Sequence, residues 1–511
     1  MSTSGSGGLW DFPGRVGAGG DEETREGRRM KRERRPLGGA SAATLAALVA
    51  LPVFGGAPAA SAGSRPSRPA GLRAANITGG IVLLRWRPSA RASTYRVIRN
   101  GRARGTGIAS ARFADRAVSP FTAYSYSVVA CNGSGCSRRS PDLTVVTRGG
   151  ACRGVGLTPR RNIQRAIDAH GERTTFCLSG GTYHVRRAII PKSYDVIWGA
   201  PGAVLTGDGS TPSALLGHSH YQRHVRVRGL TIQHFAGPEA AVAAGNNWVV
   251  EGNRIGYNAK IGVRAQDGST IRGNYVHHNG VFGMAATLHL NGATFSHNVV
   301  AFNDTKRDAL GGGAKILLSS YDRFLGNYVH DNLGNGLHCD TDCIHIVFAG
   351  NRVTGNRGIG IIYEASFAAV MRGNVVAGND REAAGRSLHF GSQIRLLSSS
   401  SVEIYGNRVV ASVRGTNGIG LVDVARGSGR FGTYRIAGDY VHDNVVVLGR
   451  GGMSGLVGTA HRPRTLNNRF RDNHYHVARV SGGHFAWVTY PMRWRGWRAA
   501  GQDRTGSIRA L

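Results

Sequence analysis

Apolar and polar residues alternate in short runs along most of this chain, and one phrase recurs from about residue 225 onward. It reads EGNRIGYN, RGNYVHHN, SHNVVAFN, LGNYVHDN, AGNRVTGN and RGNVVAGN, with a second asparagine five residues after the first. Steps of 21, 24, 29, 24 and 23 residues separate the first asparagines, which are Asn253, Asn274, Asn298, Asn327, Asn351 and Asn374. A near-constant step that accepts insertions predicts a solenoid.

The apolar runs within each repeat are about three to five residues long and lack helical periodicity, so they predict a β-solenoid. Equivalent residues of successive coils then lie about 4.8 Å apart and form ladders. We expect the asparagines to be structural, because amides stacked in register can hydrogen-bond one another and the turn backbone.

Residues 66–148 show a different pattern of alternating runs, namely IVLLRW, TYRVIRNG, TAYSYSVVACNGSG and LTVVT. Short strands separated by turn residues over about 80 to 90 residues predict an all-β sandwich. The segment resembles a fibronectin type III domain, with Trp86 at a core position and Tyr124 in the place of the tyrosine corner. No residue here suggests chemistry, and the resemblance implies a spacer or a carbohydrate-surface adaptor, of which we favour the spacer.

The repeat itself resembles the right-handed parallel β-helix proteins of the pectin-lyase-like superfamily over roughly residues 155–490. NIQRAIDA followed by TTFCLSGGTYHV is similar to the capping helix and first coils of that fold, and WRAAGQDRTGS is similar to the tail of secreted bacterial members. We therefore expect an all-β protein with a sandwich at 66–148, a right-handed parallel β-helix with a capping helix at 152–490 and a C-terminal tail at 491–511.

The first 62 residues are typical of an export signal behind an N-terminal extension. Met30 is followed by a basic cluster, the apolar run ATLAALVALPVFGG and the small-residue cleavage signal Ala60-Ser61-Ala62. The apolar run is shorter than the roughly 20 residues that a permanent membrane helix needs. The pattern predicts a secreted protein without stable membrane insertion.

The formal net charge of +34 changes the expected partners less than its size suggests. The arginines are scattered through every segment instead of lying in one stripe, so we do not expect a nucleic-acid partner. Attraction to an acidic polysaccharide or a cell-wall glycan fits better. The capping helix and the aromatic tail would close both ends of the solenoid, which favours a monomer.

Six cysteines in an exported chain predict disulfides, and they fall into local pairs: Cys131 with Cys136, Cys152 with Cys177, and Cys339 with Cys343. Four-sulfur zinc binding would need two close pairs to meet in space, for which the sequence gives no reason. Residues four apart in a strand are separated by about 13 Å, whereas a disulfide needs Cα atoms within about 7 Å. A Cys339–Cys343 bond therefore predicts a bend.

The candidate chemistry lies at this bend, in the segment HCDTDC. When Gly336 is aligned with Gly360, Asp340 falls on Glu364 one coil later, about 5 Å away on the outward face. The same face is expected to carry His338 and, through GGGAKIL, Lys315, with Asp342 close by; two coils earlier it carries the substrate-binding candidates Arg264 and Gln266.

Several reactions remain open for this cluster. A retaining glycosidase needs two carboxyl groups at about this separation, one with a raised pKa. A uronate lyase needs a cation and a base, for which Lys315 and His338 are candidates. Calcium could bridge Asp340, Asp342 and Glu364, and no other cofactor is implied. The adjacent aspartates and Gly-His-Gly motif of polygalacturonases and the Trp-Ile-Asp-His motif of pectate lyases are absent.

The leading hypothesis is a secreted polysaccharide lyase or glycoside hydrolase that acts on an acidic polysaccharide, with Asp340 and Glu364 as catalytic carboxylates. One alternative is a non-catalytic, adhesin-like protein that binds a cell-wall glycan. A third is metal handling by some of the 19 histidines, including His277, His278, His338 and His345. The non-functional interpretation is that the outward acids pair with neighbouring arginines.

Overall fold

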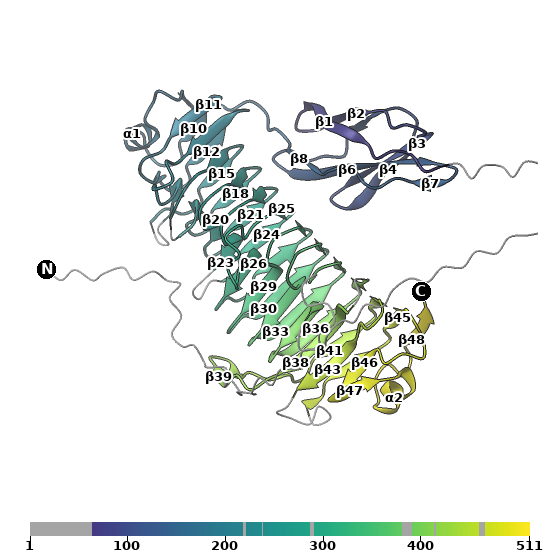
Figure 1. Ribbon diagram of the computed structural model, residues 1–511. Helices are drawn as coiled ribbons and strands as arrows, with labels where there is room; N and C mark the ends of the chain where they lie inside the picture. The colour runs from purple at the N-terminus through teal and green to yellow at the C-terminus, as the bar shows by residue number, and fades with distance from the viewer. Residues whose placement is uncertain are drawn as a thin grey trace, which may run out of the picture. The chain divides into compact units, whose positions relative to one another are not determined.

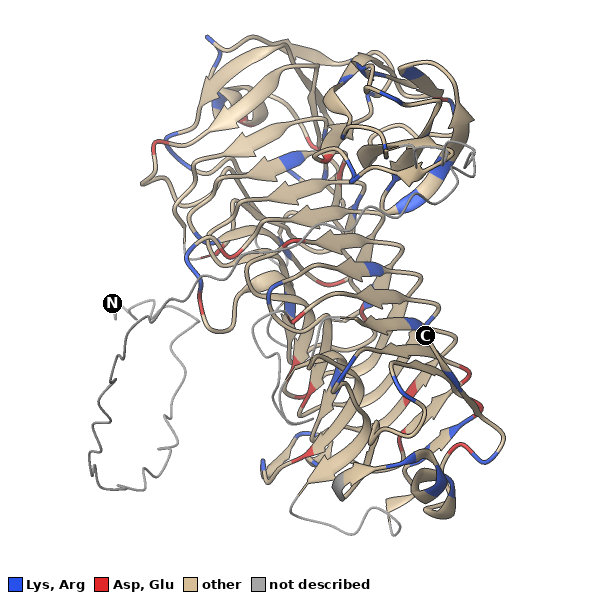
Figure 2. Ribbon diagram, turned by 45° about the vertical axis from the view of Figure 1, so that its right-hand side comes forward, with Lys and Arg blue, Asp and Glu red and all other residues tan. Residues whose placement is uncertain are grey.

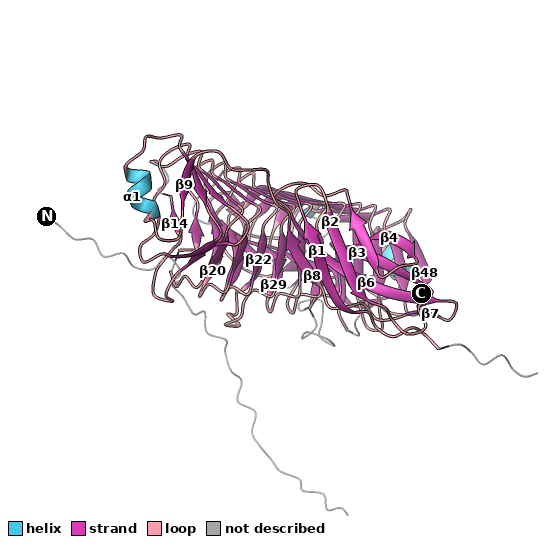
Figure 3. Ribbon diagram, turned by 90° about the horizontal axis from the view of Figure 1, so that it is seen from above, coloured by secondary structure: helices cyan, strands magenta, loops and turns pink. Residues whose placement is uncertain are grey.

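The computed structural model describes residues 64–511 except 218–220, 238, 287–290, 381–390, 413–414 and 459–465. The predicted extension and signal peptide at 1–62 lie outside the described residues. Strands form almost all the regular structure of the described part (Figures 1 and 3). Neither of its helices, α1 (Ile163–Asp168) and α2 (Trp494–Ala499), is long and apolar enough to cross a membrane.

Two antiparallel sheets enclose the core of the N-terminal β-sandwich. One has the strand order β1-β2-β5 and the other β4-β3-β6-β7, with β8 also paired to β6. Trp86 is buried against Tyr95, and the Tyr124 hydroxyl accepts a hydrogen bond from the Ser119 amide at 2.9 Å, as in a tyrosine corner. The strands are β1 (Ala70–Ile77), β2 (Val82–Arg87), β3 (Thr94–Arg99), β4 (Arg102–Ile108), β5 (Arg112–Asp115), β6 (Ala123–Asn132), β7 (Gly135–Cys136) and β8 (Leu143–Val146).

From Val155 onward the chain forms a parallel β-solenoid, in which successive strands pass through three long sheets in turn (Figure 1). We call them the first, second and third sheets, in the order in which the chain visits them. The inward column of the first sheet pairs Ile271 with Phe295 and Phe295 with Phe324, whose rings stack 4.7 Å apart. The core is therefore built from columns of like residues, as the repeat predicts.

The first sheet contains β9 (Val155–Leu157), β10 (Thr175–Leu178), β12 (Val196–Gly199), β15 (Arg226–Arg228), β18 (Val249–Glu251), β21 (Thr270–Arg272), β24 (Thr294–Ser296), β27 (Arg323–Leu325), β30 (Ile344–Ala349), β33 (Phe367–Arg372), β36 (Ser400–Tyr405), β41 (Tyr440–His442) and β44 (Arg469–Arg471). The second sheet contains β11 (Gly181–His184), β13 (Ala203–Thr206), β16 (Thr231–Gln233), β19 (Arg254–Gly256), β22 (Tyr275–His277), β25 (Val299–Ala301), β28 (Tyr328–His330), β31 (Arg352–Thr354), β34 (Val375–Ala377), β37 (Arg408–Ala411), β42 (Val445–Leu448), β45 (His474–Val477) and β48 (Ser507–Ala510).

The third sheet carries the candidate site. Its strands are β14 (Leu215–Leu216), β17 (Val242–Ala243), β20 (Ile261–Ala265), β23 (Phe282–Ala286), β26 (Gly312–Leu317), β29 (Asn335–Asp340), β32 (Ile361–Glu364), β35 (Ser392–Leu397), β38 (Asn417–Asp423), β43 (Ser454–Gly458), β46 (Phe485–Trp487) and β47 (Thr489–Met492). All its pairings are parallel except the last, between β46 and β47.

Two asparagine ladders join the coils at the turns. In each ladder the Asn side-chain amide donates to the Oδ1 of the asparagine one coil later; Asn327 donates to Asn351 in this way at 3.0 Å. The same Asn327 amide donates to the Phe295 carbonyl, and its Oδ1 accepts from the Asn298 backbone and side chain. The asparagine repeat is structural, as predicted.

Glycine precedes most asparagines of the first ladder because this corner is left-handed. Gly273 and Gly326 both have φ of +63°, a conformation that a Cβ disfavours. At a second corner the reason is space, since a Cβ on Gly336 would lie 2.4 Å from the Gly360 carbonyl oxygen. The high glycine content is therefore a consequence of tight corners repeated on every coil.

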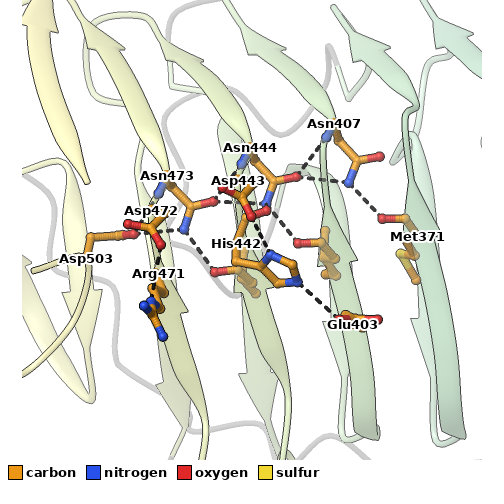
Figure 4. Close-up of polar contacts among 12 residues, drawn as sticks. Met371, Glu403, Asn407, His442, Asp443, Asn444, Arg471, Asp472, Asn473 and Asp503 are labelled. Atoms are coloured by element: carbon orange, nitrogen blue, oxygen red, sulfur yellow. Dashed lines mark hydrogen bonds and ion pairs between the residues drawn. The ribbon is translucent and has the colours of Figure 1, made fainter. Parts of the chain in front are cut away.

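Asp503 ends the first ladder, where an asparagine would otherwise stand (Figure 4). Its Oδ1 accepts from the Asn473 amide at 2.9 Å, and its Oδ2 accepts from the Tyr475 hydroxyl and the Trp497 indole at 2.8 and 2.9 Å. A carboxylate only accepts hydrogen bonds, so the last position of a one-way ladder suits it. Trp497 belongs to α2 and is fully buried, so the ladder ends where the aromatic cap begins.

The direction of this ladder predicts that exchanging amide and carboxylate destabilises the fold at both positions. Asn327→Asp would set a carboxylate against the Phe295 carbonyl and the Asn351 Oδ1, and we expect the free energy of unfolding to fall by about 3 kcal/mol. Asp503→Asn would turn an amide donor toward the Trp497 N–H, with an expected loss of about 1 to 3 kcal/mol. Denaturant titrations at pH 7 measure both losses; an Asn327→Asp protein as stable as the unaltered chain would contradict this account.

Candidate functional site

Three successive strands of the third sheet, β26, β29 and β32, bring the predicted residues together. The register pairs Lys315 with His338 and Asp340 with Glu364. Their neighbours Leu337 and Cys339 point into the core. The register predicted from the glycine alignment is thus confirmed, and the four side chains share the outward face of the sheet.

Two parallel diagonal contacts organise these side chains. The Lys315 Nζ lies 2.9 Å from the Asp340 Oδ2, and the His338 Nε2 lies 3.2 Å from the Glu364 Oε2. In each pair the acid lies on the next strand, two residues beyond the position that faces its partner. Long side chains can reach one another across this diagonal. Lys315 and His338 are 1% and 4% exposed, whereas the Asp340 and Glu364 side chains are 14% and 12% exposed. The carboxylates therefore form the accessible part.

The disulfide between Cys339 and Cys343 bends the chain immediately after Asp340. Thr341 and Asp342 both take φ of +51°, so two consecutive left-handed residues make the turn from β29 to β30. Asp340 is the last residue of its strand and keeps its register with Glu364. The other two local pairs, Cys131–Cys136 and Cys152–Cys177, are also bonded. HCDTDC is thus a disulfide-bonded turn that carries acids of the site.

A hairpin far along the chain also reaches the site. It lies in the segment 424–436 and contains β39 (Ser428–Gly429) and β40 (Gly432–Thr433). Arg426 forms an ion pair with the Glu364 Oε1, and the Arg430 backbone N–H donates to the Asp342 Oδ2 at 2.9 Å. Tyr434 and Phe431 pack on Phe367 at 5.7 and 5.9 Å between ring centroids. The hairpin is thus held by both polar and apolar contacts.

Not every predicted residue joins the cluster. Asp342 is held by the hairpin. Burial raises the pKa of Tyr434, and the hydrogen bond and charge of Asp342 raise it further. Arg264 stands two strands from Lys315 and pairs with Glu239, while Gln266 follows β20 in the next turn. His277 lies in the second sheet, away from His338.

The electrostatic environment holds Glu364 in its charged form. Burial would raise the pKa of Glu364, but the hydrogen bond and charge of His338, followed by the charges of Arg426 and Arg395, lower it from 4.5 to about 2. Arg395 comes from β35, the strand after β32; burial lowers its pKa, and the negative charges of Glu364 and Asp380 oppose that shift. Glu364 is therefore an ionised carboxylate surrounded by cations.

A metal ion is one further possibility for the cluster, since ligand atoms of His338, Asp340 and Glu364 lie within 4.8 Å of one another. The carboxylates, however, already have cationic partners in Lys315 and Arg426. A divalent cation would have to displace or repel these partners. The donor set therefore fits an internal ion-pair network better than the predicted calcium site.

Sequence reasoning missed Arg395 and Arg426. An extra segment precedes β35, and Gln393 stands where the repeat has glycine, so the register of Arg395 could not be counted from the glycines. The run IRLL, with its inward Ile394 and Leu396, was the available signal. Arg426 lies in an insertion outside any repeat, and no sequence signal connected it with Glu364, 62 residues earlier.

Part of the solenoid is similar in sequence to a known protein family. Residues 239–409 match the family described as the right-handed beta helix region. The solenoid is a right-handed parallel β-helix. No curated protein sequence matches the chain.

Three solved structures are similar to all or part of the described chain. The A-module of a mannuronan C-5 epimerase from Azotobacter vinelandii has a TM-score of 0.46 and 17% identity, covering 68% of this chain and 93% of that one. A family 28 exopolygalacturonase from Yersinia enterocolitica has a TM-score of 0.35 and 11% identity, covering 87% and 99%. A human collagen alpha-1(XX) fn3 domain has a TM-score of 0.16 and 23% identity, covering 19% and 98%.

The lowered pKa of Glu364 predicts a defined pH dependence of stability. Its ion pairs stabilise the fold fully above the ordinary value of 4.5, and this contribution is lost as the pH falls from about 4.5 to about 2. Glu364→Gln leaves His338, Arg395 and Arg426 without their carboxylate, so we expect a loss of about 3 kcal/mol at pH 7. In denaturant titrations from pH 7 to pH 2.5 the two proteins should converge in acid, and a constant difference would contradict this.

Proposed function

We propose that this protein is an exported carbohydrate-active enzyme that removes the C5 proton of a uronate residue in an acidic polysaccharide, as a polysaccharide lyase does. The observation that carries the proposal is the His338–Glu364 pair, at 3.2 Å, beside the Lys315–Asp340 pair at 2.9 Å. Together the pairs supply a titratable imidazole, two fixed carboxylates and a buried cation on one face of the sheet.

Lyase chemistry fits these residues better than hydrolysis. A retaining glycosidase needs one carboxylic acid with a raised pKa to protonate the leaving oxygen. Glu364 has a lowered pKa instead, and Asp340 is bound to the Lys315 ammonium. Imidazole, by contrast, can accept a proton near neutral pH.

The proposed step is a β-elimination. His338 accepts the C5 proton at Nδ1, since its Nε2 contacts Glu364 and its Nδ1 has no hydrogen-bond partner among the described residues. The electron pair of the C5–H bond forms the C4–C5 double bond, and the C4–O glycosidic bond breaks. The departing oxygen takes a proton from an acid or from water. A cation must neutralise the uronate carboxylate, because the intermediate carries extra charge on it. The products are a new reducing end and an unsaturated sugar.

Each residue of the site has a distinct role in this scheme. Glu364 orients the His338 ring and stabilises its protonated form, as carboxylates do in other carboxylate–histidine pairs. Arg426 binds the substrate carboxylate, since its side chain is 40% exposed while that of Lys315 is 1% exposed. Lys315 and Asp340 position each other beneath the sugar, and Asp342 holds the hairpin that carries Arg426.

The direct test uses the purified chain against pectate, alginate, hyaluronan, heparin-like and cell-wall glycans. Ultraviolet absorbance of unsaturated ends and release of reducing sugar are followed together, with and without chelator. We expect both signals on a uronate-containing polymer. Reducing ends without ultraviolet absorbance would refute the lyase assignment in favour of hydrolysis, and saturable binding without product would favour the adhesin-like alternative.

His338→Gln should remove turnover without unfolding the protein, because glutamine keeps a polar contact with Glu364 but cannot take up a proton. We expect kcat to fall about a hundredfold or more. Thermal unfolding within a few degrees of the unaltered protein confirms the fold, and retained turnover in a folded His338→Gln protein would remove this residue from the mechanism.

Arg426→Gln should lower kcat/KM about tenfold on carboxylated substrate and less on its methyl ester, because the lost interaction is with the carboxylate. Arg430→Gln is the matched control. It removes one charge from the same hairpin, but Arg430 contacts Asp342 through its backbone N–H only. Equal losses for the two variants on both substrates would mean that Arg426 acts through general charge and not at the carboxylate.

A further inference from the structure

The N-terminal end of the solenoid contains a cavity of about 490 Å³. It lies between α1 and the segment 183–189, which begins within β11. It lies at the first coils, whereas the candidate site lies on β26, β29 and β32 of the third sheet. Its size is in the range of small-molecule binding sites, which span about 300 to 1,000 Å³. Pro159 and residues 161–165 and 183–189 supply its lining.

The lining of this cavity is basic. It includes Arg161, Arg165, Arg186 and Arg187 together with His184, and it includes no acidic side chain. Within the part of the chain that the structure describes, none of these four guanidinium groups forms an ion pair. Elsewhere arginines do pair, as Arg426 does with Glu364. All four arginines are exposed, so solvent screens their mutual repulsion, while an anion placed between them would be attracted to each.

The inner wall of the cavity is apolar and fixed. Ile163, Val185, Ile189 and Tyr183 are buried. The Gln164 amide is held on both sides, because its Oε1 accepts from the Ile190 N–H at 2.8 Å and its Nε2 donates to the Asp168 Oδ1 at 2.8 Å. The cavity thus combines a wall of buried apolar side chains with a rim of exposed arginines, and ligand pockets likewise combine an apolar lining with a few polar groups.

We propose that this cavity binds a phosphate monoester carried on a sugar. A phosphate monoester carries up to two negative charges and three acceptor oxygens, and guanidinium groups bind such groups through two parallel hydrogen bonds. Four arginines exceed what a single carboxylate can use. The volume leaves room for the sugar against Tyr183 and Ile189. This site is separate from the proposed lyase centre and uses none of its residues.

The test measures binding of a hexose phosphate to the purified chain by isothermal titration calorimetry at 150 mM salt. We expect saturable binding with one site per chain, at least tenfold weaker binding of glucuronate, and none of the unphosphorylated hexose. A hexose sulfate, with one charge fewer, should bind more weakly than the phosphate. Absence of saturation, or equal affinity for glucuronate and hexose phosphate, would overturn the proposal.

Two double variants separate this site from general attraction to a basic protein. Arg186→Gln with Arg187→Gln removes two cavity arginines and should weaken binding at least tenfold. Arg153→Gln with Arg160→Gln removes the same charge from exposed arginines of this region that do not line the cavity, and affinity should stay within twofold. Equal weakening would refute the site. Ala188→Trp, which fills the cavity and keeps every charge, should also abolish binding if the fold is retained.

Discussion

One hydrogen bond, the side-chain amide of an asparagine donating to the Oδ1 of the asparagine one coil later, determines how the solenoid is arranged. Because the amide also satisfies a backbone carbonyl of the preceding coil, a slip of one residue would leave buried donors and acceptors unpaired. The ladder thus imposes the register of every strand that follows it. Asp503 can end the first ladder because its side-chain partners, Asn473, Tyr475 and Trp497, all donate to it.

The fixed register is also what makes a site possible on the third sheet. Side chains two residues apart on adjacent strands meet on the diagonal, so one coil supplies Lys315 and the next supplies the acid that it binds, Asp340. The coil that supplies His338 is followed by the coil that supplies Glu364. The Lys315–Asp340 and His338–Glu364 pairs thus arise side by side from the repeat itself, without any specialised loop.

The effect of the charged residues in this protein depends on their immediate neighbours. Lysines and arginines are spread over the coils with acidic residues among them (Figure 2), so the net charge of +34 does not form one binding face. At Glu364 the surrounding cations hold a carboxylate in its ionised form, which argues against an acid catalyst there. At the N-terminal cavity four arginines but no acidic side chain form the lining, and the same residue type supports the proposed anion site.

The repeat of asparagine and glycine determined the solenoid and the facing of Asp340 with Glu364, because parallel coils in register convert sequence spacing directly into position. Local spacing likewise determined the three disulfides and the bend after Asp340. The position of Arg426 at the site could not be predicted from the repeat, since its hairpin is an insertion whose path depends on packing against Phe367 and on Asp342. The ionisation of Glu364 was equally hidden, because burial and the convergence of His338, Arg395 and Arg426 on this carboxylate exist only in the folded chain.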